Sequence, residues 1–407
     1  MSAPPRHTPL RVACVSVSAA LGGSEWVLLD FASRAQALGV DATVVLPKAG
    51  PLGEALAAAG VPVVIAPADA DLLEMTQRAM LSPEGLLRFG RGIARWSGEI
   101  ARALKPLTVA GERAPLLYSN GFKAHLACAL ARGHRHVWHL HEFPPDRLAI
   151  VWRALSAALP DARIANSEAV AAAWEMAGLA RPVVVTNGVD LARFAPAPKT
   201  WWIHDQLGLD HGARLIGMPA VFARWKGHLK VVEAFERAAA RLDDVHLVLV
   251  GGPIYDTSAE KGYAEELVRR VRRSSASGAQ GQQPLSDRIH FLRFDPEPWR
   301  LYPEFDLVVH FSTRPEPFGR VITEAMASGV PVIAADAGGP REIVEDGVTG
   351  WRVPPGDVPA LSQRMVAALE ADTGPMRAAA RRAAEERFSA DRFARAVADT
   401  LLRVAAT

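Results

Sequence analysis

The chain has 407 residues, which is long for one hydrophobic core and predicts two domains of about 200 residues each. Hydrophobic residues make up 49% of the chain and charged residues 22%, so a disordered chain is excluded. The 46 basic residues nearly balance the 44 acidic ones, and the net charge of +2 excludes the strong positive field typical of nucleic-acid-binding proteins.

The amino-terminal segment holds a short apolar run that two kinds of structure can explain. A basic residue precedes the run and small residues follow it, as in a signal peptide. We favour a buried strand over residues 12–17 that turns at Gly22 and Gly23, because the run is short and β-branched. Cys14 and Cys128 lie in apolar runs, which indicates reduced, buried thiols and a cytoplasmic protein. No stretch approaches the ~20 apolar residues that a membrane span needs.

Short β-branched runs alternate with amphipathic segments along the whole chain. In the first half we expect strands at residues 11–18, 41–47, 61–67, 115–120, 136–142, 162–167 and 182–190. After a Pro-rich linker near residues 190–200, the pattern restarts with strands at 214–222, 245–252, 288–294, 306–312 and 331–336. Amphipathic segments such as 25–38 separate several of these runs. This alternation predicts an α/β protein with two parallel sheets, each covered by helices on both faces.

These elements define the expected domains. The first domain covers residues 1–190, the second covers 205–385, and a capped amphipathic helix occupies 386–407. The Ser-, Gly- and Gln-rich segment 272–287 is expected to be a loop of the second domain. Parallel sheets bind ligands at the carboxyl ends of their strands. Glycines, histidines and a lysine follow expected strands at these ends, at positions 22–23, 139–141, 226–227 and 314–319.

The stretch "EPFGRVITE" combines a bend, a helix start and two carboxylates. Prolines on both sides of Glu316 stiffen the backbone, and a helix begins near Gly319, where N–H groups at its positive end suit a diphosphate. Glu324 lies in that helix, where a carboxylate can accept both hydroxyls of a ribose. Glu316, before the bend, can reach the far end of the same ligand. The pair suggests a nucleotide-sugar site; the alternative is that Glu324 complements the helix dipole and Glu316 is a solvated loop charge.

At these residues the sequence resembles the retaining GT-B glycosyltransferases of family 4. Their hallmark is a glutamate followed by Pro-Phe-Gly and, after seven intervening residues, a second glutamate, and residues 316–357 match it almost throughout. The resemblance extends to five shorter segments, "GGSEWVLLDFASRAQALG", "WHLHEFP", "NSEAV", "TNGVDLARFAP" and "WKGH". It implies the GT-B fold, with two Rossmann-like domains facing each other across a cleft.

The resemblance also implies roles for residues of the second domain. Glu324 would hold the ribose hydroxyls of the donor, and Glu316 would contact a sugar hydroxyl near the reacting carbon. The bend and helix start would line the sugar and the diphosphate through the backbone of Phe318, Gly319, Arg320 and Val321. Lys226 would neutralise the leaving diphosphate as a point charge.

The first domain is expected to contribute three donor contacts and the acceptor site. Gly22 and Gly23 would close over the phosphates, because a side chain there would block the approach. His141 matches the histidine that the family aims at the donor sugar. His139 and Glu142 stand beside it, but no fourth ligand is evident and the family needs no metal, so no catalytic metal is expected. A structural pair of histidines is the other alternative.

The sequence departs from the family pattern at two places. Val221 stands where the family commonly has an arginine, and Arg224 follows three residues later. Three explanations are open. Arg224 reaches the phosphate site in place of the missing arginine, Lys226 and the helix dipole stabilise the diphosphate without an arginine, or the enzyme has lost part of its catalytic rate. Arg293 replaces the usual glycine close to the expected position of the nucleotide base, with Phe294 next to it, so the base stays open between uridine and guanosine.

The expected function is retaining transfer from a nucleoside-diphosphate-sugar to a hydroxyl of a glycan, lipid-linked or small-molecule acceptor. The acceptor hydroxyl would attack from the face that the diphosphate leaves, and no carboxylate can be assigned as the nucleophile of a double displacement. A non-catalytic nucleotide-sugar-binding or scaffold protein is the alternative, supported only by Val221. A metal-dependent transferase using Asp69 and Asp71 is weaker, since a helix N-cap explains that pair. A dinucleotide oxidoreductase would need spaced glycines that "LGGSEW" lacks.

A basic amphipathic helix in the first domain raises the question of membrane contact. The segment "EGLLRFGRGIARWSGEIARALKP" carries Arg88, Arg91, Arg95 and Arg102 among apolar residues. It fits a helix at the inner face of a membrane, facing a lipid-linked acceptor, or a helix packed on the sheet with solvated arginines. The resemblance further implies that the carboxyl-terminal helix crosses back onto the first domain, so the two domains are expected to close on the donor.

Overall fold

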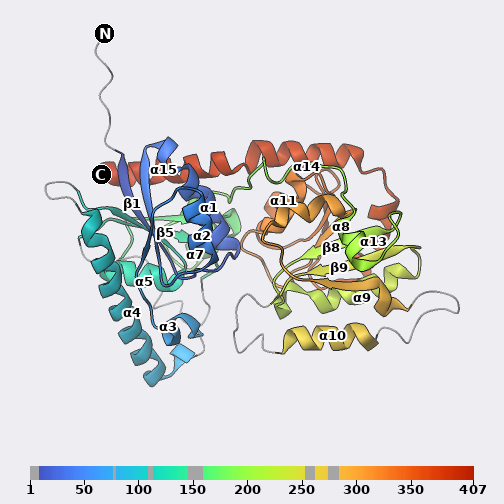
Figure 1. Cartoon of the computed structure of the whole chain (residues 1–407), viewed down its shortest axis with the longest axis horizontal. Coiled ribbons are helices and arrows are strands. Elements are labelled where there is room, and N and C mark those ends of the chain that lie inside the picture. Colours follow the sequence, from blue (N-terminus) through green and yellow to red (C-terminus); the bar gives the residue numbers. More distant parts are fainter. Residues whose placement is uncertain are drawn as a thin grey trace, which may run out of the picture. The chain divides into compact units, whose positions relative to one another are not determined.

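The chain forms two compact units, each built on its own parallel sheet (Figure 1). The computed structural model describes residues 9–76, 79–108, 113–131, 133–144, 159–252, 262–273 and 284–407. Unit 1 comprises Met1–Gly188 and Ala390–Thr407, and unit 2 comprises Val189–Ser389. The two-domain, parallel-sheet fold class expected from the sequence is confirmed.

In the described part of unit 1, a seven-stranded parallel sheet has the order β3-β2-β1-β4-β5-β6-β7. Its strands are β1 (Leu10–Ser16), β2 (Val40–Leu46), β3 (Val63–Ile65), β4 (Leu116–Asn120), β5 (His136–Leu140), β6 (Ala162–Ala165) and β7 (Val183–Val184). The apolar run near the amino end therefore forms β1 in the middle of the sheet, where Val12, Ala13, Cys14 and Val15 are buried. Each apolar run expected to be a strand in this half is one.

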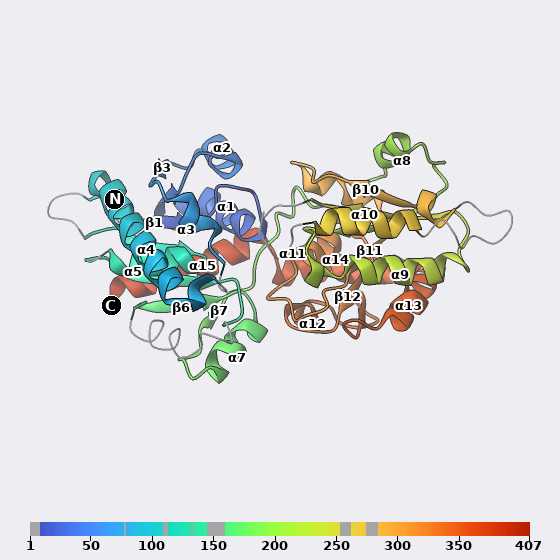
Figure 2. The ribbon, with the colours of Figure 1, turned by 90° about the horizontal axis from the view of Figure 1, so that it is seen from below.

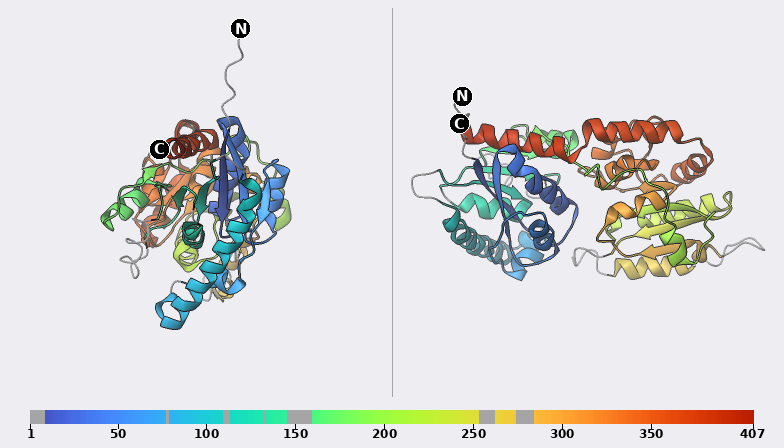
Figure 3. Two further views of the ribbon diagram at one scale, coloured as in Figure 1. Left: turned by 90° about the vertical axis from the view of Figure 1, so that its left-hand side faces the viewer. Right: turned by 45° about the horizontal axis from the view of Figure 1, so that its top comes forward.

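Helices cover both faces of this sheet. On one face lie α1 (Gly23–Ala35), α2 (Pro51–Ala58) and α15 (Ala390–Ala406), and on the other lie α3 (Ala70–Glu74), α4 (Pro83–Leu104) and α5 (Phe122–Leu130). Figure 3 shows α15 and the pair α4 and α5 on opposite sides of the strands. The short α7 (Glu168–Met176) packs beside β6 and β7. Ser167 caps it by accepting from the N–H of Val170 at 3.1 Å.

In unit 2, the described strands form a six-stranded parallel sheet with the order β10-β9-β8-β11-β12-β13. They are β8 (Arg214–Pro219), β9 (Val245–Val250), β10 (Ile289–Leu292), β11 (Leu307–His310), β12 (Val332–Ala335) and β13 (Trp351–Val353). Five of these were expected. Sequence inspection missed β13, because three residues at the edge of a sheet give no periodic pattern.

The helices of unit 2 again lie on both faces of the sheet. One face carries α9 (His228–Ala239), α10 (Tyr263–Arg273) and α13 (Val358–Glu370), and the other carries α8 (Trp202–Leu207), α11 (Arg320–Ala327) and α14 (Gly374–Arg387). Figure 2 shows α9 and α10 running side by side over the strands. The short α12 (Gly339–Ile343) follows β12.

Short 3₁₀ turns complete the described connections. In unit 1 they are η1 (Gln36–Leu38), η2 (Ala79–Leu81) and η3 (Lys105–Leu107). In unit 2 they are η5 (Arg224–Lys226), η7 (Leu285–Arg288), η8 (Pro298–Arg300) and η9 (Tyr302–Glu304). Of the expected loop 272–287, residues 274–283 lie outside the described residues.

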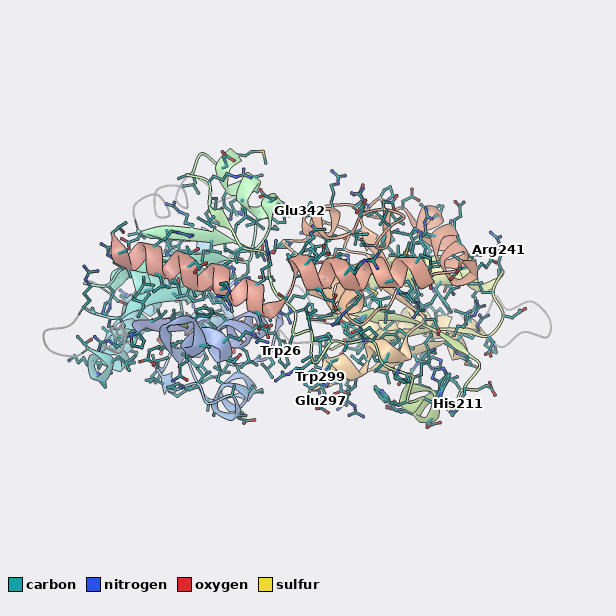
Figure 4. All side chains as sticks on the ribbon, turned by 90° about the horizontal axis from the view of Figure 1, so that it is seen from above. Trp26, His211, Arg241, Glu297, Trp299 and Glu342 are labelled. Atoms are coloured by element: carbon teal, nitrogen blue, oxygen red, sulfur yellow. The ribbon has the colours of Figure 1, made fainter. Side chains whose placement is uncertain are left out.

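The structure divides the chain differently from the expected boundaries at the start of the second domain. Unit 2 begins at Val189 rather than at 205, so the Pro-rich segment near 190–200 belongs to it. Phe194 in this segment is buried and packs edge to face on Trp299, which Figure 4 labels, and on Tyr302. The Arg381 side chain donates to the carbonyl of Phe194 at 2.8 Å. Proline prevents regular structure in this segment but does not prevent its side chains from packing.

The carboxyl-terminal end divides between the units. Residues 386–389 complete unit 2, and α15 belongs to unit 1, where Phe393, Val397 and Leu401 join the core. A Cβ on Gly188 would lie 2.5 Å from the Cα of Ala390, so only glycine fits at this contact. Within unit 2, the N–H of Val189 donates to the carbonyl of Phe388 at 2.7 Å, so the two chain segments that connect the units run side by side.

Helix α4 has a buried apolar side and an exposed basic side. Phe89, Ile93, Trp96 and Ile100 are buried against the sheet. The exposed side is less basic than the sequence suggests, because Arg95 pairs with Asp69 at 3.3 Å and Arg102 pairs with Glu99 at 2.6 Å. Over the described ranges, no helix is both long and apolar enough to cross a membrane.

A buried hydrogen-bond chain links β4, β5 and α5 in unit 1. The indole N–H of Trp138 donates to Nδ1 of His136 at 3.2 Å, so His136 is protonated on Nε2. That Nε2–H contacts Oγ of Ser119 at 2.8 Å, which leaves the Ser119 hydroxyl to donate to Nδ1 of His125 at 2.6 Å. The imidazoles of His136 and His125 are therefore both neutral. Burial lowers the pKa of His136 to about 3, and it holds the pKa of His125 and of His139 well below the usual range.

This arrangement predicts acid sensitivity of unit 1. Below the ordinary histidine pKa of about 6.5 the unfolded chain binds protons that the folded chain excludes, so the free energy of unfolding falls as the pH drops from about 6.5 towards 3. Each such histidine adds a slope of about 1.4 kcal/mol per pH unit. Urea unfolding at a pH of about 7, 6 and 5 should show a shallower slope in His136→Gln than in the wild type.

The matched control is His134→Gln, since His134 lies in the loop before β5, outside the buried network, and its Nδ1 contacts the carbonyl of Pro115 at 2.9 Å. It should leave the slope unchanged. An equal slope in His136→Gln and the wild type would show that His136 does not contribute to the acid sensitivity.

Candidate donor site in unit 2

Glu316 is buried and has a partner on each carboxylate oxygen. Its Oε1 accepts from Nζ of Lys226 at 2.5 Å. Its Oε2 accepts from Nε2 of His310 at 2.7 Å and from the hydroxyl of Ser312 at 2.5 Å. The residue is 8% exposed, so the expectation of a solvated loop charge is wrong.

Electrostatics keep this carboxylate ionised. Burial alone would raise the pKa of Glu316, but Lys226, followed by His310, outweighs burial and holds that pKa well below its usual range. Because three donors and a positive charge favour the carboxylate, Glu316 is an acceptor of hydrogen bonds rather than an acid at neutral pH.

The backbone of Glu316 is fixed by two glycines that follow β12. The N–H of Gly339 donates to the carbonyl of Glu316 at 2.8 Å, and Glu316 and Gly338 form a parallel bridge. Gly338 has φ +68°, and a Cβ there would lie 2.3 Å from the carbonyl oxygen of Glu316. A Cβ on Gly339 would lie 2.6 Å from the Cα of Phe318. Only glycine allows the two chain segments to approach this closely.

Glu324 is also buried and held on both oxygens. The hydroxyl of Tyr302 donates to Oε2 at 2.5 Å, and Nε of Arg320 contacts Oε1 at 3.2 Å. Burial, together with the neighbouring Glu324 charge, raises the pKa of Tyr302 well above its usual range, so Tyr302 keeps its proton as the donor. Glu324 is the fifth residue of α11, outside the first turn, so a simple interaction with the helix dipole does not explain it.

The bend before α11 is built as the sequence suggested. Gly319 caps the helix with φ +104°, and α11 begins at Arg320 with Val321 next. The N–H groups of a first helical turn have no carbonyl of their own helix to donate to. The side chain of Phe318 points into the core of unit 2, where it contacts Phe388, so only its backbone faces the bend.

Lys226 is positioned by a tight turn after β8. It ends the 3₁₀ turn η5, and Gly227 follows with φ +82°. A Cβ on Gly227 would lie 2.2 Å from the carbonyl oxygen of Phe311, so the turn packs directly on the segment after β11. The N–H of Thr313 also donates to the carbonyl of Trp225 at 2.7 Å. These contacts place Lys226 beside Glu316.

Arg224 lies apart from this cluster. Its guanidinium pairs with Glu266 of α10 at 2.6 Å and lies 4.9 Å from the ring centre of Tyr263. Val221 lies two residues beyond β8 and accepts from the N–H of Ala223 at 2.8 Å. Arg224 therefore contacts α10 and does not lie beside Lys226 in the phosphate site, the first of the three expected possibilities.

Arg293 and Phe294 follow β10 and are both exposed. Phe294 is 40% exposed, which is unusual for a large apolar side chain beside a strand end. A Cβ on Gly252, at the end of β9, would lie 4.0 Å from the Phe294 ring. The ring therefore stands at the carboxyl edge of the unit 2 sheet.

The remaining expected residues belong to unit 1. Gly22 is the N-cap of α1, and Gly23 is its first residue. Glu25 in the first turn of α1 is 2% exposed, and burial raises its pKa. The Asn120 side chain donates to the carbonyl of Ser24 at 3.0 Å, so the glycine turn is tied to the end of β4.

The two histidines at the end of β5 contact each other but differ in environment. Their ring centres are 4.0 Å apart. His139 is 1% exposed, and its Nδ1 contacts the hydroxyl of Tyr118 at 2.5 Å, whereas His141 is half-buried. His139 is therefore a core residue, and His141 is the one of the pair placed at the carboxyl edge of the sheet.

Within the described ranges, no three His, Cys, Asp or Glu side chains are arranged to hold a metal ion. Asp69 is at the N-cap position of α3 but makes no side-chain cap; it pairs with Arg95 instead. A helix follows Asp69 as expected, but the expectation that the Asp69 side chain caps it is wrong.

Sequence analysis missed His310, Ser312, Tyr302 and Gly338 as parts of the site. His310 and Ser312 are two residues apart at the end of β11, a spacing that puts them on one side of an extended chain. That alternation, just before Glu316, is a signal that sequence inspection can use. Tyr302 and Gly338 come from other segments, and only the folded chain brings them to the glutamates.

Gly338→Ala tests the backbone support of Glu316. The added Cβ would collide with the Glu316 carbonyl, and Gly338 has a ψ of −144° with its φ of +68°, close to a backbone region that almost only glycine adopts. We therefore expect a loss of stability of about 1–3 kcal/mol. Gly347→Ala is the matched control, because Gly347 has a similar φ of +78° and nothing within 4 Å of a Cβ. Urea unfolding should show the larger loss in Gly338→Ala; equal losses would mean that contact with Glu316 does not matter.

Comparisons with known proteins agree with the two-unit fold. The family model described as Glycosyltransferase Family 4 matches residues 21–193, and the model described as Glycosyl transferases group 1 matches residues 199–387. Anabaena Alr3699/HepE, solved in complex with UDP-glucose, is 27% identical with a TM-score of 0.79, covering 97% of this chain and 100% of that chain. A glycosyltransferase from Rickettsia africae ESF-5 is 19% identical with a TM-score of 0.76, covering 98% and 99%, and supports the fold alone.

Curated relatives match only part of their length. The D-inositol 3-phosphate glycosyltransferase of Mycolicibacterium gilvum is 35% identical over 169 residues, 41% of this chain and 34% of the relative. The GDP-mannose-dependent alpha-mannosyltransferase of Mycobacterium tuberculosis is 30% identical over 211 residues, 52% of this chain and 48% of the relative. The chain thus spans less than half the length of these two relatives. The two family models, the two parallel-sheet units and the buried Glu316 and Glu324 lead to one assignment: this chain belongs to the GT-B glycosyltransferases of family 4.

Proposed function

We propose that the chain transfers a sugar, with retention at the anomeric carbon, from a nucleoside-diphosphate-sugar to a hydroxyl of an acceptor. The observation that carries this proposal is the pair of buried carboxylates on either side of a helix start, Glu316 with Lys226 and Glu324 with Tyr302. A polyhydroxylated ligand with a diphosphate in its middle matches that order of charges. Transfer without a metal is part of the proposal.

Each group in unit 2 has a role in this scheme. The nucleoside end lies at Glu324, whose oxygens accept the ribose hydroxyls. The diphosphate lies at the start of α11, where the backbone of Gly319, Arg320 and Val321 begins the helix. The sugar end lies at Glu316. Lys226 leaves Glu316 for the diphosphate and compensates the negative charge that develops there.

Unit 1 is proposed to bind the acceptor. Gly22, Gly23 and His141 are the residues of this unit proposed to contact the donor, the glycines at the phosphates and His141 at the sugar. Retention follows if the acceptor oxygen bonds to the anomeric carbon on the face from which the diphosphate oxygen departs. The acceptor proton then passes to a phosphate oxygen of the leaving nucleoside diphosphate, so the protein needs no nucleophile of its own.

The donor base is proposed to be uracil or guanine. The UDP-glucose complex of Anabaena Alr3699/HepE supports a uridine donor, and the GDP-mannose-dependent relative supports a guanosine donor. Arg293 and the exposed Phe294 lie at the strand end proposed to face the base. The inositol 3-phosphate in the name of the Mycolicibacterium gilvum relative falls within the proposed acceptor class, a glycan, lipid-linked or small-molecule hydroxyl.

Two substitutions separate donor binding from catalysis. Glu324→Gln should weaken the thermal stabilisation by UDP or GDP, because a neutral amide accepts ribose hydroxyls less strongly. Glu316→Gln should keep that stabilisation but lower the rate of donor hydrolysis or transfer by about a hundredfold or more. Thermal shift and nucleoside diphosphate release, measured over UDP- and GDP-sugars with and without EDTA, check both effects.

Glu297→Gln is the matched control, because Glu297 is exposed and its carboxylate pairs with Arg300 at 3.6 Å. It should behave as the wild type. Donor binding without any turnover in the wild type would favour the alternative, a nucleotide-sugar-binding scaffold that Val221 supports. A rate abolished by EDTA and restored by a divalent metal would contradict the metal-free part of the proposal.

Contact with an anionic membrane is proposed only for the amino-terminal end of α4. Leu86 and Leu87 are 60% and 55% exposed there, next to the exposed Arg88 and Arg91. Two apolar side chains among cations suit the boundary between lipid headgroups and chains. The farther half of the helix, with Arg95 and Arg102 in ion pairs, has less free positive charge to offer.

Vesicle sedimentation tests this contact. Binding to vesicles rich in anionic lipid should fall strongly in the double variant Arg88→Gln/Arg91→Gln, because each cation near such a surface contributes about 1 kcal/mol. Arg95→Gln/Arg102→Gln is the matched control and should lose less. Equal losses, or no binding by the wild type, would leave α4 as a helix packed on the sheet.

A further inference from the structure

The two oxygens of Glu316 have different kinds of partner. Oε1 contacts only the mobile end of a long side chain, Nζ of Lys226 at 2.5 Å. Oε2 accepts two hydrogen bonds from side chains at the end of β11 and two residues beyond it, His310 at 2.7 Å and Ser312 at 2.5 Å. A carboxylate oxygen only accepts, so Nε2 of His310 carries a hydrogen and the Ser312 hydroxyl donates.

The partner of Oε1 is also more exposed to solvent than the partners of Oε2. The side chain of Lys226 is 15% exposed, that of His310 is 3% exposed, and Ser312 is fully buried. A ligand can therefore reach Oε1 by displacing Lys226. It cannot reach Oε2, because that side is filled by β11 and its side chains.

The donors on Oε2 are held in place by the sheet. His310 is the last residue of β11, which pairs with β8 on one side and β12 on the other. The segment after β11 is fixed by the turn at Gly227, whose Cα packs on the carbonyl of Phe311. His310 and Ser312 thus stay where they are when Lys226 moves.

We propose that His310 and Ser312 are positioning residues that hold Glu316 through Oε2 and thereby reserve Oε1 for the donor sugar. This inference rests on the proposed function. When the donor enters, a sugar hydroxyl takes the place of Lys226 on Oε1, and Lys226 turns to the diphosphate. The bonds to Oε2 keep Glu316 ionised and aimed during this exchange, when it would otherwise be a buried carboxylate without any donor.

The test uses the pH dependence of turnover. In His310→Leu and Ser312→Ala, Glu316 loses a donor to its charged form, so its pKa rises and the acidic limb of kcat moves to higher pH. We expect kcat to fall about tenfold in each variant, as for the loss of one charge-assisted hydrogen bond, with a smaller change in the KM for the donor. His310→Gln and Ser312→Thr keep a hydrogen-bond donor near Oε2. Both variants should therefore have the kcat of the wild type and its pH profile in acid.

Controls separate positioning from a merely structural role. His246→Gln and Ser328→Ala change a buried histidine and a buried serine of the same unit whose side chains make no hydrogen bond to either glutamate. The backbone N–H of Ser328 donates to the carbonyl of Glu324 at 3.0 Å, and alanine keeps that bond. They should leave the acidic limb where it is. An unmoved limb in His310→Leu and Ser312→Ala, in an active enzyme, would overturn the inference while leaving the proposed function intact.

An inactive wild type would contradict the proposed function itself. The stability of the variants tests the role of His310 in that case, because it can be measured without any enzyme activity. Glu316 has a depressed pKa in the folded state, so its contribution to stability is present above the ordinary glutamate pKa of about 4.3 and is lost as the pH falls below it. Urea unfolding of His310→Leu should therefore show a loss at neutral pH that shrinks in acid. In the Glu316→Gln background the same substitution should cost clearly less. Equal costs in both backgrounds would mean that His310 does not act through Glu316.

Discussion

The arrangement of unit 2 depends on the burial of one charged group, the carboxylate of Glu316. A carboxylate out of water is stable only with charge-assisted hydrogen bonds on both oxygens, and the chain supplies them from the turn after β8 and from the end of β11. The glycines at 227, 338 and 339 follow from this demand, because they let the segments carrying Lys226, His310 and Glu316 approach at backbone contact.

Glu324 repeats the same solution in a simpler form. A tyrosine from the turn before β11 and an arginine one helical turn earlier occupy its oxygens. Both glutamates are therefore preorganised before any ligand arrives, and the helix start between them is held by Gly319. Preorganised acceptors need little rearrangement when a ligand binds, which is the condition for strong electrostatic stabilisation in a closed site.

The buried histidines of unit 1 are satisfied in the opposite way. The chain from Trp138 through His136 and Ser119 to His125 is satisfied only while both imidazoles are neutral, so it contains no charge. A neutral network tolerates burial without an ion pair, but it makes the unit sensitive to acid. The contrast matches the proposed division of labour, in which unit 2 binds an anionic donor and unit 1 receives a hydroxyl acceptor.

The sequence by itself determined the α/β class, twelve of the strands and the central motif, because these are local. Strand periodicity, the helix start at Gly319 and the spacing of Glu316 and Glu324 can be read over short stretches. Only the tertiary structure decided what the motif contacts. Tyr302, Gly338 and Lys226 reach the glutamates through separate turns, Arg224 turns to Glu266, and residues 189–204 join unit 2. The physical reason is that hydrogen bonds and ion pairs depend on distance in space, which periodicity along a chain does not encode.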